Sequence, residues 1–210
     1  MRNTLYKNLE TALDQLQIGD IILFHTKKIW HSKRIRQLTG SYWNHVALVF
    51  DTIRINGNEK EIIIVEAGVT GIEIHRLSKY IKSGIEEIGF KRIPDLTEQE
   101  KIRFIGFFLD AIDTPYNYRR MFPYLLRPFI KRYFGDKAQK TFQRWSVDFD
   151  SYICSSFTQR CFYLASEPEK RKKRLFINQK NLNLYECMEE VTPGAIGKSK
   201  SAIWLYNPHA

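Results

Sequence analysis

The chain has 210 residues, of which 43% are apolar and 14% aromatic, and its 33 Lys and Arg residues outnumber 23 Asp and Glu residues. This length suits one domain with a buried core, and the apolar content excludes an intrinsically disordered chain. No apolar run reaches the ~18–20 residues of a membrane span, and residues 1–10 lack the apolar core of ~7–15 residues found in signal peptides. We therefore expect a cytoplasmic protein.

Three cysteines, Cys154, Cys161 and Cys187, lie in the last third of the chain. They are too few for the disulfide framework of a small secreted protein, and none belongs to a Cys-x-x-Cys pair that would indicate a zinc site. The pattern favours a reducing compartment and is compatible with one reactive thiol. We expect no metal and no cofactor.

The net charge of +10 is concentrated in two segments. Residues 118–145 hold eight Lys and Arg against one Asp, and residues 168–174 hold five against one Glu. The rest of the chain is close to neutral, so any contact with an anionic partner is expected at these two segments.

In chain order, apolar spacing predicts an amphipathic helix over residues 4–17, ended by Gly19-Asp20, and then a short buried strand over 21–24. Residues 29–39 are mixed and basic, a helix or a loop, and residues 46–50 form a strongly apolar strand. Asn56-Gly57 is a turn dipeptide, so residues 61–66 are the returning strand of a hairpin. Further strands are expected at 72–76 and about 85–92.

The second half is mainly helical. A capping box at residues 97–100 opens a helix, in which five apolar residues make one stripe: Ile102, Ile105, Phe108, Leu109 and Ile112. Residues 118–145 are helical but interrupted by two prolines, and a helix over about 154–165 places Cys154, Phe157, Cys161 and Leu164 on one stripe. A turn at 192–194 and a strand at 202–206 close the chain. We find no repeat and no linker, and strands followed by helices favour a single α+β domain over residues 1–210.

Cys154 is the best candidate for a nucleophile. It follows Asp150-Ser151-Tyr152, residue types typical of a helix start, and the dipole and free N–H groups of a helix start favour a thiolate and an oxyanion. The alternative is that Cys154 is a core residue, because free cysteines are usually small buried hydrophobic residues. Cys161 and Cys187 are expected in the core.

His45 stands out among the histidines because it opens a buried strand. A two-residue loop at Asn56-Gly57 pairs residues whose numbers sum to 113, so His45 faces Gly68 and Glu66 is its diagonal neighbour. Diagonal neighbours lie roughly 7–8 Å apart at Cα, within reach of these side chains, and a bulge would place them directly opposite. The alternative is an unrelated histidine and an exposed glutamate at two strand ends.

Residues 118–134 interleave aromatic and cationic side chains. Such a mixture is found in packed amphipathic helices, on surfaces that bind anionic membranes, and in proteins that bind single-stranded nucleic acid. The first interpretation is favoured, membrane contact is the alternative, and nucleic acid is the least favoured. The basic run at 170–174 has no aromatic residues and is expected to be a solvated loop.

Five short motifs, taken in order, resemble the circularly permuted NlpC/P60 papain-like proteins, and most closely their YiiX/YaeF-type branch. They read LQIGDIILF at 16–24, NHVALV at 44–49, VEA at 65–67 followed by GI at 71–72, TPYNY at 114–118, and CSSF at 154–157. The resemblance covers roughly residues 10–165 and implies a papain-like α+β fold, in which the cysteine helix packs on an antiparallel, barrel-like sheet. Residues 118–145 are then a basic aromatic helical insertion.

The resemblance implies that Cys154 is the nucleophile, His45 the base and Glu66 the residue that orients the imidazole. Tyr42, Tyr116 and Ser155 are expected to contact the substrate. The related lecithin–retinol acyltransferases have a second histidine about twelve residues after the first, where this chain has Gly57, and their Asn-Cys-Glu-His signature is absent around Cys154.

We therefore expect a cysteine-dependent peptidase or amidase that acts on a small peptide or a cell-wall-derived fragment through an acyl thioester. The alternatives are a thiol acyltransferase or lipid hydrolase whose residues 118–145 contact an anionic membrane, and a catalytically inactive binding module that keeps the fold.

Overall fold

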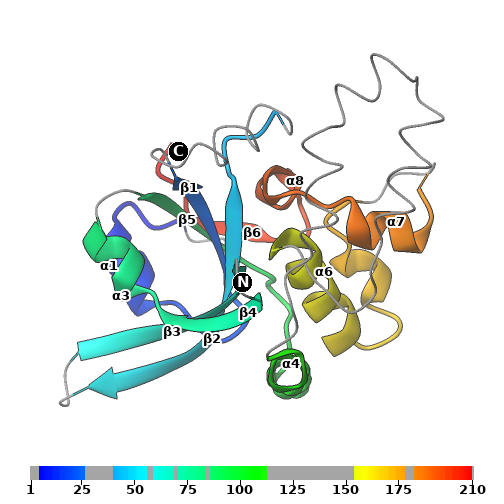
Figure 1. Ribbon diagram of the computed structural model, residues 1–210, viewed down its shortest axis with the longest axis horizontal. Coiled ribbons are helices and arrows are strands. Elements are labelled where there is room, and N and C mark those ends of the chain that lie inside the picture. Colours follow the sequence, from blue (N-terminus) through cyan, green and yellow to red (C-terminus); the bar gives the residue numbers. More distant parts are fainter. Residues whose placement is uncertain are drawn as a thin grey trace.

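The computed structural model describes residues 5–26, 40–55, 59–68, 71–83, 86–112, 154–177 and 182–209, to which every statement below refers. Its strands are β1 (Ile21–Thr26), β2 (His45–Ile55), β3 (Glu59–Gly68), β4 (Gly71–Arg76), β5 (Glu86–Arg92) and β6 (Ile203–Tyr206). Its helices are α1 (Leu9–Asp14), α3 (Ser78–Ser83), α4 (Glu98–Ala111), α6 (Cys154–Ala165), α7 (Leu184–Glu189) and α8 (Pro193–Lys198), with a short 3-10 helix η1 (Arg171–Arg174) (Figure 1). The predicted insertion at 118–145, the segment 29–39 and Tyr116 lie outside the described residues.

The six strands form one antiparallel sheet in the order β4-β3-β2-β1-β5-β6. Within the described residues β4 and β6 are its two edges and do not pair, so the sheet is open and the expected barrel-like closure is wrong. Alternation along each strand gives the sheet two apolar faces. The expected α+β architecture, with the cysteine helix packed on an antiparallel sheet, is confirmed.

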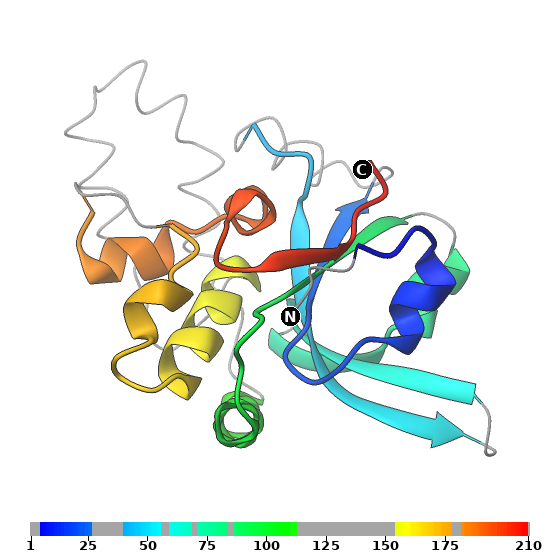
Figure 2. The same ribbon diagram turned by 180° about the vertical axis from the view of Figure 1, so that it is seen from behind.

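Helices cover both faces of this sheet (Figures 1 and 2). Helices α4, α6 and α8 pack on the face that carries Ile21, Leu23 and Leu48, whereas α1 and the residues around α3 pack on the face that carries Ile22 and Phe24. Strand β1 is therefore buried on both faces, which explains why its first four residues, 21–24, form an apolar run rather than an alternating pattern.

Helix α4 begins as predicted but turns a different face inward. The Thr97 side chain accepts a hydrogen bond from the Glu100 backbone N–H and the Glu100 side chain accepts one from Thr97, which confirms the capping box. The predicted stripe is only partly correct, because Phe108 is buried but Ile102 and Leu109 are exposed, and the other buried apolar residues are Phe104 and Ala111. The phenylalanines pack against α6, with the Phe104 and Phe162 rings 5.2 Å apart.

Two other helices also differ from their predictions. Helix α1 begins at Leu9, after the N-cap Asn8, and not at residue 4, and Leu5 is exposed. Helix α6 spans the predicted residues, but Leu164 is exposed on it although Cys154, Phe157 and Cys161 are buried. The apolar stripe of α6 therefore ends one turn earlier than the spacing indicated.

Several short helices were not predicted from the sequence. Thr192-Pro193-Gly194, interpreted as a turn, is the N-cap and first turn of α8, in which the Thr192 side chain accepts a hydrogen bond from the Ala195 N–H and Pro193 occupies the first position. Helices α3 and α7 and the 3-10 helix η1 are six residues or shorter, too short for a periodic pattern. The basic run at 170–174, expected to be a loop, is this 3-10 turn, and Arg174 in it is buried.

The Gly19-Asp20 dipeptide fixes the start of β1. Gly19 has a φ of +86°, which favours glycine, and Asp20 is 1% exposed. The Asp20 carboxylate accepts hydrogen bonds from the Gln17 N–H at 2.9 Å and from Arg92 Nε and Nη2 at 2.7 and 2.6 Å. This bidentate pair ties the turn before β1 to β5.

The helices of the described segments are all too short or too polar to cross a lipid bilayer.

Candidate active site

The β2–β3 hairpin brings His45 and Glu66 together. The pairs Leu48–Val65 and Val49–Ile64 have numbers that sum to 113, the predicted register, whereas Ile55 pairs with Glu59, a sum of 114. The predicted two-residue loop is therefore wrong, and an irregularity between Val49 and Asp51 restores the predicted register on the side of His45. This bulge leaves the two residues in the predicted diagonal register rather than directly opposite, and their side chains meet.

His45 stands at the first position of β2, next to Phe24 of β1, whose ring centroid lies 5.8 Å from the imidazole. The preceding residue, Asn44, is buried and accepts a hydrogen bond from the Thr26 N–H at 3.0 Å. This bond anchors the entry into β2, so the position of His45 is fixed by the sheet, while its side chain stays 27% exposed.

Glu66 is 3% exposed, and both of its carboxylate oxygens have partners. Oε2 lies 2.6 Å from His45 Nε2, and Oε1 accepts a hydrogen bond from the Tyr80 hydroxyl of α3. The Nε2 of His75 on β4 lies 3.6 Å from Oε1. A buried carboxylate needs such partners, because burying a charge without them is unfavourable.

The electrostatics of the pair favour the charged forms. Burial alone would lower the pKa of His45, but its electrostatic interactions with Cys154 and Glu66 and the hydrogen bond to Glu66 raise it well above 6.5. Burial would raise the pKa of Glu66, and His45, Tyr80 and His75 together hold it below its usual value of 4.5. A carboxylate and an imidazolium are therefore the favoured state near neutral pH.

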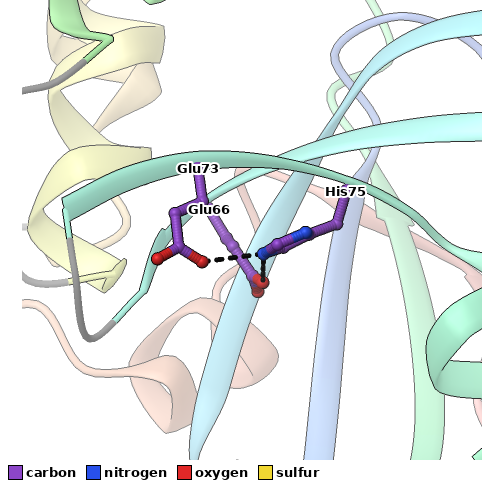
Figure 3. Close-up of side chains that lie close together, drawn as sticks. All are labelled: Glu66, Glu73 and His75. Carbon is purple, nitrogen blue, oxygen red and sulfur yellow. Dashed lines mark hydrogen bonds and ion pairs between the residues drawn. The ribbon is translucent and has the colours of Figure 1, made fainter.

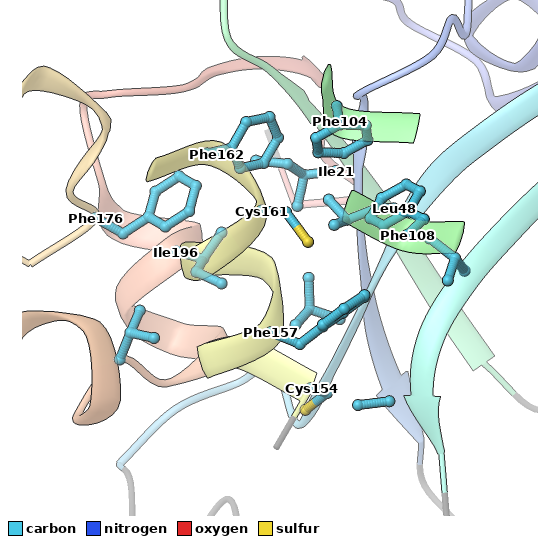
Figure 4. Packing of buried hydrophobic residues seen from close by; sticks show 14 of the residues in the cluster. Ile21, Leu48, Phe104, Phe108, Cys154, Phe157, Cys161, Phe162, Phe176 and Ile196 are labelled. Carbon is cyan, nitrogen blue, oxygen red and sulfur yellow. The ribbon is translucent and has the colours of Figure 1, made fainter. Parts of the chain in front are cut away.

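Cys154 is the first residue of α6 and is 6% exposed. Figure 4 shows it at the start of the helix, at the margin of the apolar cluster, with Cys161 two turns further along and within the cluster. Cys154 interacts electrostatically with His45, and Nδ1 is the imidazole nitrogen that does not contact Glu66. Cys161 is fully buried, and burial raises its pKa well above 9.0.

The expected substrate-binding residues lie in different surroundings. Ser155 is buried, and its hydroxyl donates to the Val191 carbonyl at 2.6 Å, so this side chain ties α6 to the residues before α8. Tyr42 is 37% exposed; its ring stacks on His25 with centroids 3.9 Å apart, and its hydroxyl donates to Glu87. Tyr116 lies outside the described residues.

Behind Glu66 lies a cluster that the sequence analysis did not connect to the site (Figure 3). His75 Nε2 is 2.7 Å from Glu73 Oε2, and Glu66 pairs with Glu73 across β3 and β4. Extending the tight β3–β4 register would have placed Glu66, Glu73 and His75 on one face, since residues two apart share a face. Among the described residues these three have ligand atoms close enough for a metal ion, within 4.8 Å of one another. Hydrogen bonds and ion pairs already account for their arrangement, so we assign no metal to them.

The sequence comparisons identify the family of the chain. A family model described as "Permuted papain-like amidase enzyme, YaeF/YiiX, C92 family" matches residues 15–122, just over half of the chain. The match includes His45, Glu66 and Tyr80 and ends before Cys154. No curated protein matches the chain at a significant level. The family match agrees with the resemblance noted in the five sequence motifs, and the chain belongs to the YaeF/YiiX family of permuted papain-like amidases.

Proposed function

We propose that the protein cleaves an amide with Cys154 as nucleophile, His45 as general base and acid, and Glu66 as the residue that orients His45. The observation that carries this proposal is the His45 imidazole, which contacts Glu66 through Nε2 and interacts electrostatically with Cys154. A nucleophile, a base and an orienting group in this sequence are the usual requirements of covalent acyl transfer.

The charges around His45 support the nucleophile. An imidazolium whose pKa is raised persists at neutral pH, and its positive charge stabilises a neighbouring thiolate. Cys154 also stands in the first turn of a twelve-residue helix, whose free N–H groups and dipole favour negative charge.

In the first half of the reaction, the Cys154 thiolate attacks the substrate carbonyl and the carbonyl oxygen becomes an oxyanion. N–H groups of the first turn of α6 would stabilise that oxyanion. When the C–N bond breaks, the His45 imidazolium gives its proton to the leaving amine, and an acyl thioester remains on Cys154.

In the second half, His45 takes a proton from water, and the resulting hydroxide equivalent attacks the thioester carbonyl. The C–S bond breaks, a carboxylic acid leaves, and the thiolate and imidazolium are restored. Glu66 stays ionised throughout and fixes which imidazole nitrogen faces the thiol.

The alkylation rate of each cysteine, followed against pH by peptide mass spectrometry, tests the pair. An ordinary thiol with a pKa near 8.5 is less than about 1% ionised at pH 6, so it reacts slowly there. We expect Cys154 to react at least about tenfold faster at pH 6 than either Cys161 or Cys187, and to lose that advantage in His45→Ala.

The controls come from the same chain. Cys161 and Cys187 are buried and serve as internal references, and His209→Ala removes a histidine that is 49% exposed and paired with Glu87. His209→Ala should keep the fast reaction of Cys154. Equal, slow reaction of all three cysteines in the native protein would contradict the proposal and favour a core cysteine in a binding module.

Turnover of a panel of peptide amides, cell-wall-derived amides and acyl lipids then addresses the substrate class. We expect amide cleavage that is abolished in Cys154→Ala, and no change when anionic vesicles are added. Cleavage of acyl lipids alone, increased by anionic vesicles and decreased by salt, would favour the lipid alternative instead.

A further inference from the structure

Tyr80 contacts the carboxylate oxygen of Glu66 that does not contact His45. Its hydroxyl donates a hydrogen bond to Oε1, while His45 Nε2 contacts Oε2 at 2.6 Å. Glu66 is 3% exposed, so water has little access to replace a missing donor. The orientation of the carboxylate plane is thus set by two side chains, one on each oxygen.

We propose that Tyr80 is a positioning residue of the active site, which holds the Glu66 carboxylate in the orientation that pairs with His45. The inference rests on the roles proposed above for Cys154 and His45. Tyr80 would be a fourth residue beside Cys154, His45 and Glu66, and it acts on Cys154 only through the other two.

The fold holds Tyr80 rigidly enough for this role. Helix α3 follows β4 directly and is tied back to β3 at two points, since the Leu77 N–H donates to the Ile62 carbonyl at 2.8 Å and the Ser78 hydroxyl to Glu61 Oε2 at 2.9 Å. The Tyr80 ring then packs on Phe24, with centroids 4.9 Å apart. The same Phe24 ring lies 5.8 Å from the His45 imidazole, so one aromatic side chain contacts both residues.

The groups that face the Glu66 carboxylate show what Tyr80 contributes to its position. His45, Tyr80 and His75 face Glu66 from β2, α3 and β4, and together they hold its pKa below 4.5 against the effect of burial. Glu73 pairs with His75, and Lys79 Nζ lies 5.9 Å from the Tyr80 ring centroid. His75 Nε2 is 3.6 Å from Oε1, beyond the range of a good hydrogen bond, so Tyr80 is the one close donor to that oxygen among the described side chains.

Without the Tyr80 hydroxyl, a different orientation of the Glu66 carboxylate is favoured. Oε1 would lack a donor, and rotation toward His75 would satisfy it while drawing Oε2 away from His45. A weaker contact between Glu66 and His45 lowers the basicity of the imidazole, and the thiolate of Cys154 loses part of its stabilisation.

The test is the pH profile of Cys154 alkylation in Tyr80→Phe, which removes the hydroxyl and keeps the ring on Phe24. We expect the midpoint of the profile to rise by about one pH unit, so that the rate at pH 6 falls about tenfold. The rate above pH 10 should be unchanged, because the thiol is then ionised without help. A residue that only packs the helix would not move this midpoint.

Two further variants make the readout specific. Tyr163→Phe is the matched control, since Tyr163 lies on α6, where Arg171 stands over its ring, and it should leave the profile unchanged. In a Glu66→Gln background, Tyr80→Phe should have no additional effect, because the proposed path from Tyr80 to Cys154 runs through the Glu66 carboxylate.

The outcomes separate this inference from the proposed function. If wild-type Cys154 reacts fast at pH 6, loses this in His45→Ala and keeps it in Tyr80→Phe, the role of Tyr80 is overturned while the function stands. If wild-type Cys154 is slow at pH 6, the function itself fails. Thermal unfolding checks that Tyr80→Phe is folded, and Tyr80→Leu, which also lacks the hydroxyl, replaces it if it is not, with the same expected shift.

Discussion

Glu66 Oε2 lies 2.6 Å from His45 Nε2, and this contact leaves Nδ1 as the imidazole nitrogen available to Cys154. The contact joins two strands of one hairpin, whereas Cys154 comes from a helix more than eighty residues later. The proposed base and its proposed orienting group are thus fixed by local pairing, whereas the proposed nucleophile is positioned by the packing of α6 on the sheet.

Glu66→Gln should lower the basicity of His45. The amide keeps nearly the size of the carboxylate but has no charge, and this charge is one of the causes that raise the pKa of His45. We expect the imidazole pKa, followed by NMR titration, to fall toward 6.5. Glu73→Gln is the control and should shift it less, because Glu73 reaches Glu66 through His75. An unchanged His45 titration in Glu66→Gln would show that the charge does not act on the imidazole.

The His45–Glu66 pair should also make stability depend on pH. The pKa of His45 is raised on folding, so its contribution is complete below 6.5 and is lost as the pH rises through the folded-state value. The pKa of Glu66 is lowered on folding, so its contribution is present above 4.5 and is lost as the pH falls through its folded-state value. The pair is therefore most stabilising between about pH 4.5 and 6.5.

Urea unfolding of the wild type and His45→Ala from pH 5.5 to 10 measures this contribution. The difference in the free energy of unfolding should be larger at pH 5.5 than at pH 10 by about 1–2 kcal/mol, the usual range for a charged hydrogen bond that is partly exposed. A difference that grows with pH would have the wrong sign and would contradict the raised pKa of His45.

Gly194→Ala should disturb the entry into β2. A Cβ on Gly194 would overlap the side chain of Ser41, whose hydroxyl donates to the Trp43 carbonyl at 2.8 Å, two residues before His45. Overpacking of this kind costs about 1–3 kcal/mol, and we expect the alkylation of Cys154 at pH 6 to slow as well.

Gly106→Ala is the matched control for that change. Gly106 is exposed on α4, and a Cβ there meets nothing within 4 Å. Alanine in an open helical position should stabilise the protein by about 0.5–1 kcal/mol and leave Cys154 unaffected. If both variants changed stability alike, the packing of α8 on Ser41 would not be the cause.

The sequence predicted the parts of the site that depend on the two-residue period of strands. His45 and Glu66 were placed on one face by counting across a turn, and the helix start at Cys154 followed from the residue types before it. The count assumed a loop one residue too short, and the irregularity between Val49 and Asp51 compensates for it. A bulge of this kind leaves no mark in the sequence, so the correct register near His45 came from two offsetting irregularities.

The features that the sequence did not predict depend on tertiary packing. Helix α4 is apolar on more than one face, so its spacing predicted the burial of Phe108 but not that Phe104 would be buried rather than Ile102 and Leu109. Tyr80 lies on a six-residue helix, and its contact with Glu66 depends on how α3 folds back over β3. The Pro-Gly pair at the start of α8 has the residue types of a turn as well as those of a first helical turn.

Lys91→Met should destabilise the fold through the C-terminal end of α8. Lys91 is 1% exposed, and its Nζ donates to the carbonyls of Ile196, Gly197 and Ser199 at 2.9, 2.8 and 2.7 Å. Burial lowers the pKa of Lys91 to about 8, so the ammonium group is still mostly charged at pH 7. Methionine removes every donor, so three carbonyls at a helix end lose their hydrogen bond from Nζ, and the position of Nζ over the Trp204 ring, 4.9 Å from its centroid, is lost as well.

We expect a loss of about 3 kcal/mol in the free energy of unfolding at pH 7, measured with urea, since each buried acceptor left without a donor costs about 1–3 kcal/mol and water reaches part of this helix end. Lys198→Met, on the exposed side of the same helix, should change stability by less than about 0.5 kcal/mol. Because α8 packs against the segment that leads to His45, Lys91→Met should also slow Cys154 alkylation at pH 6. A variant as stable as the wild type would mean that the Nζ hydrogen bonds do no more than offset the burial of the charge.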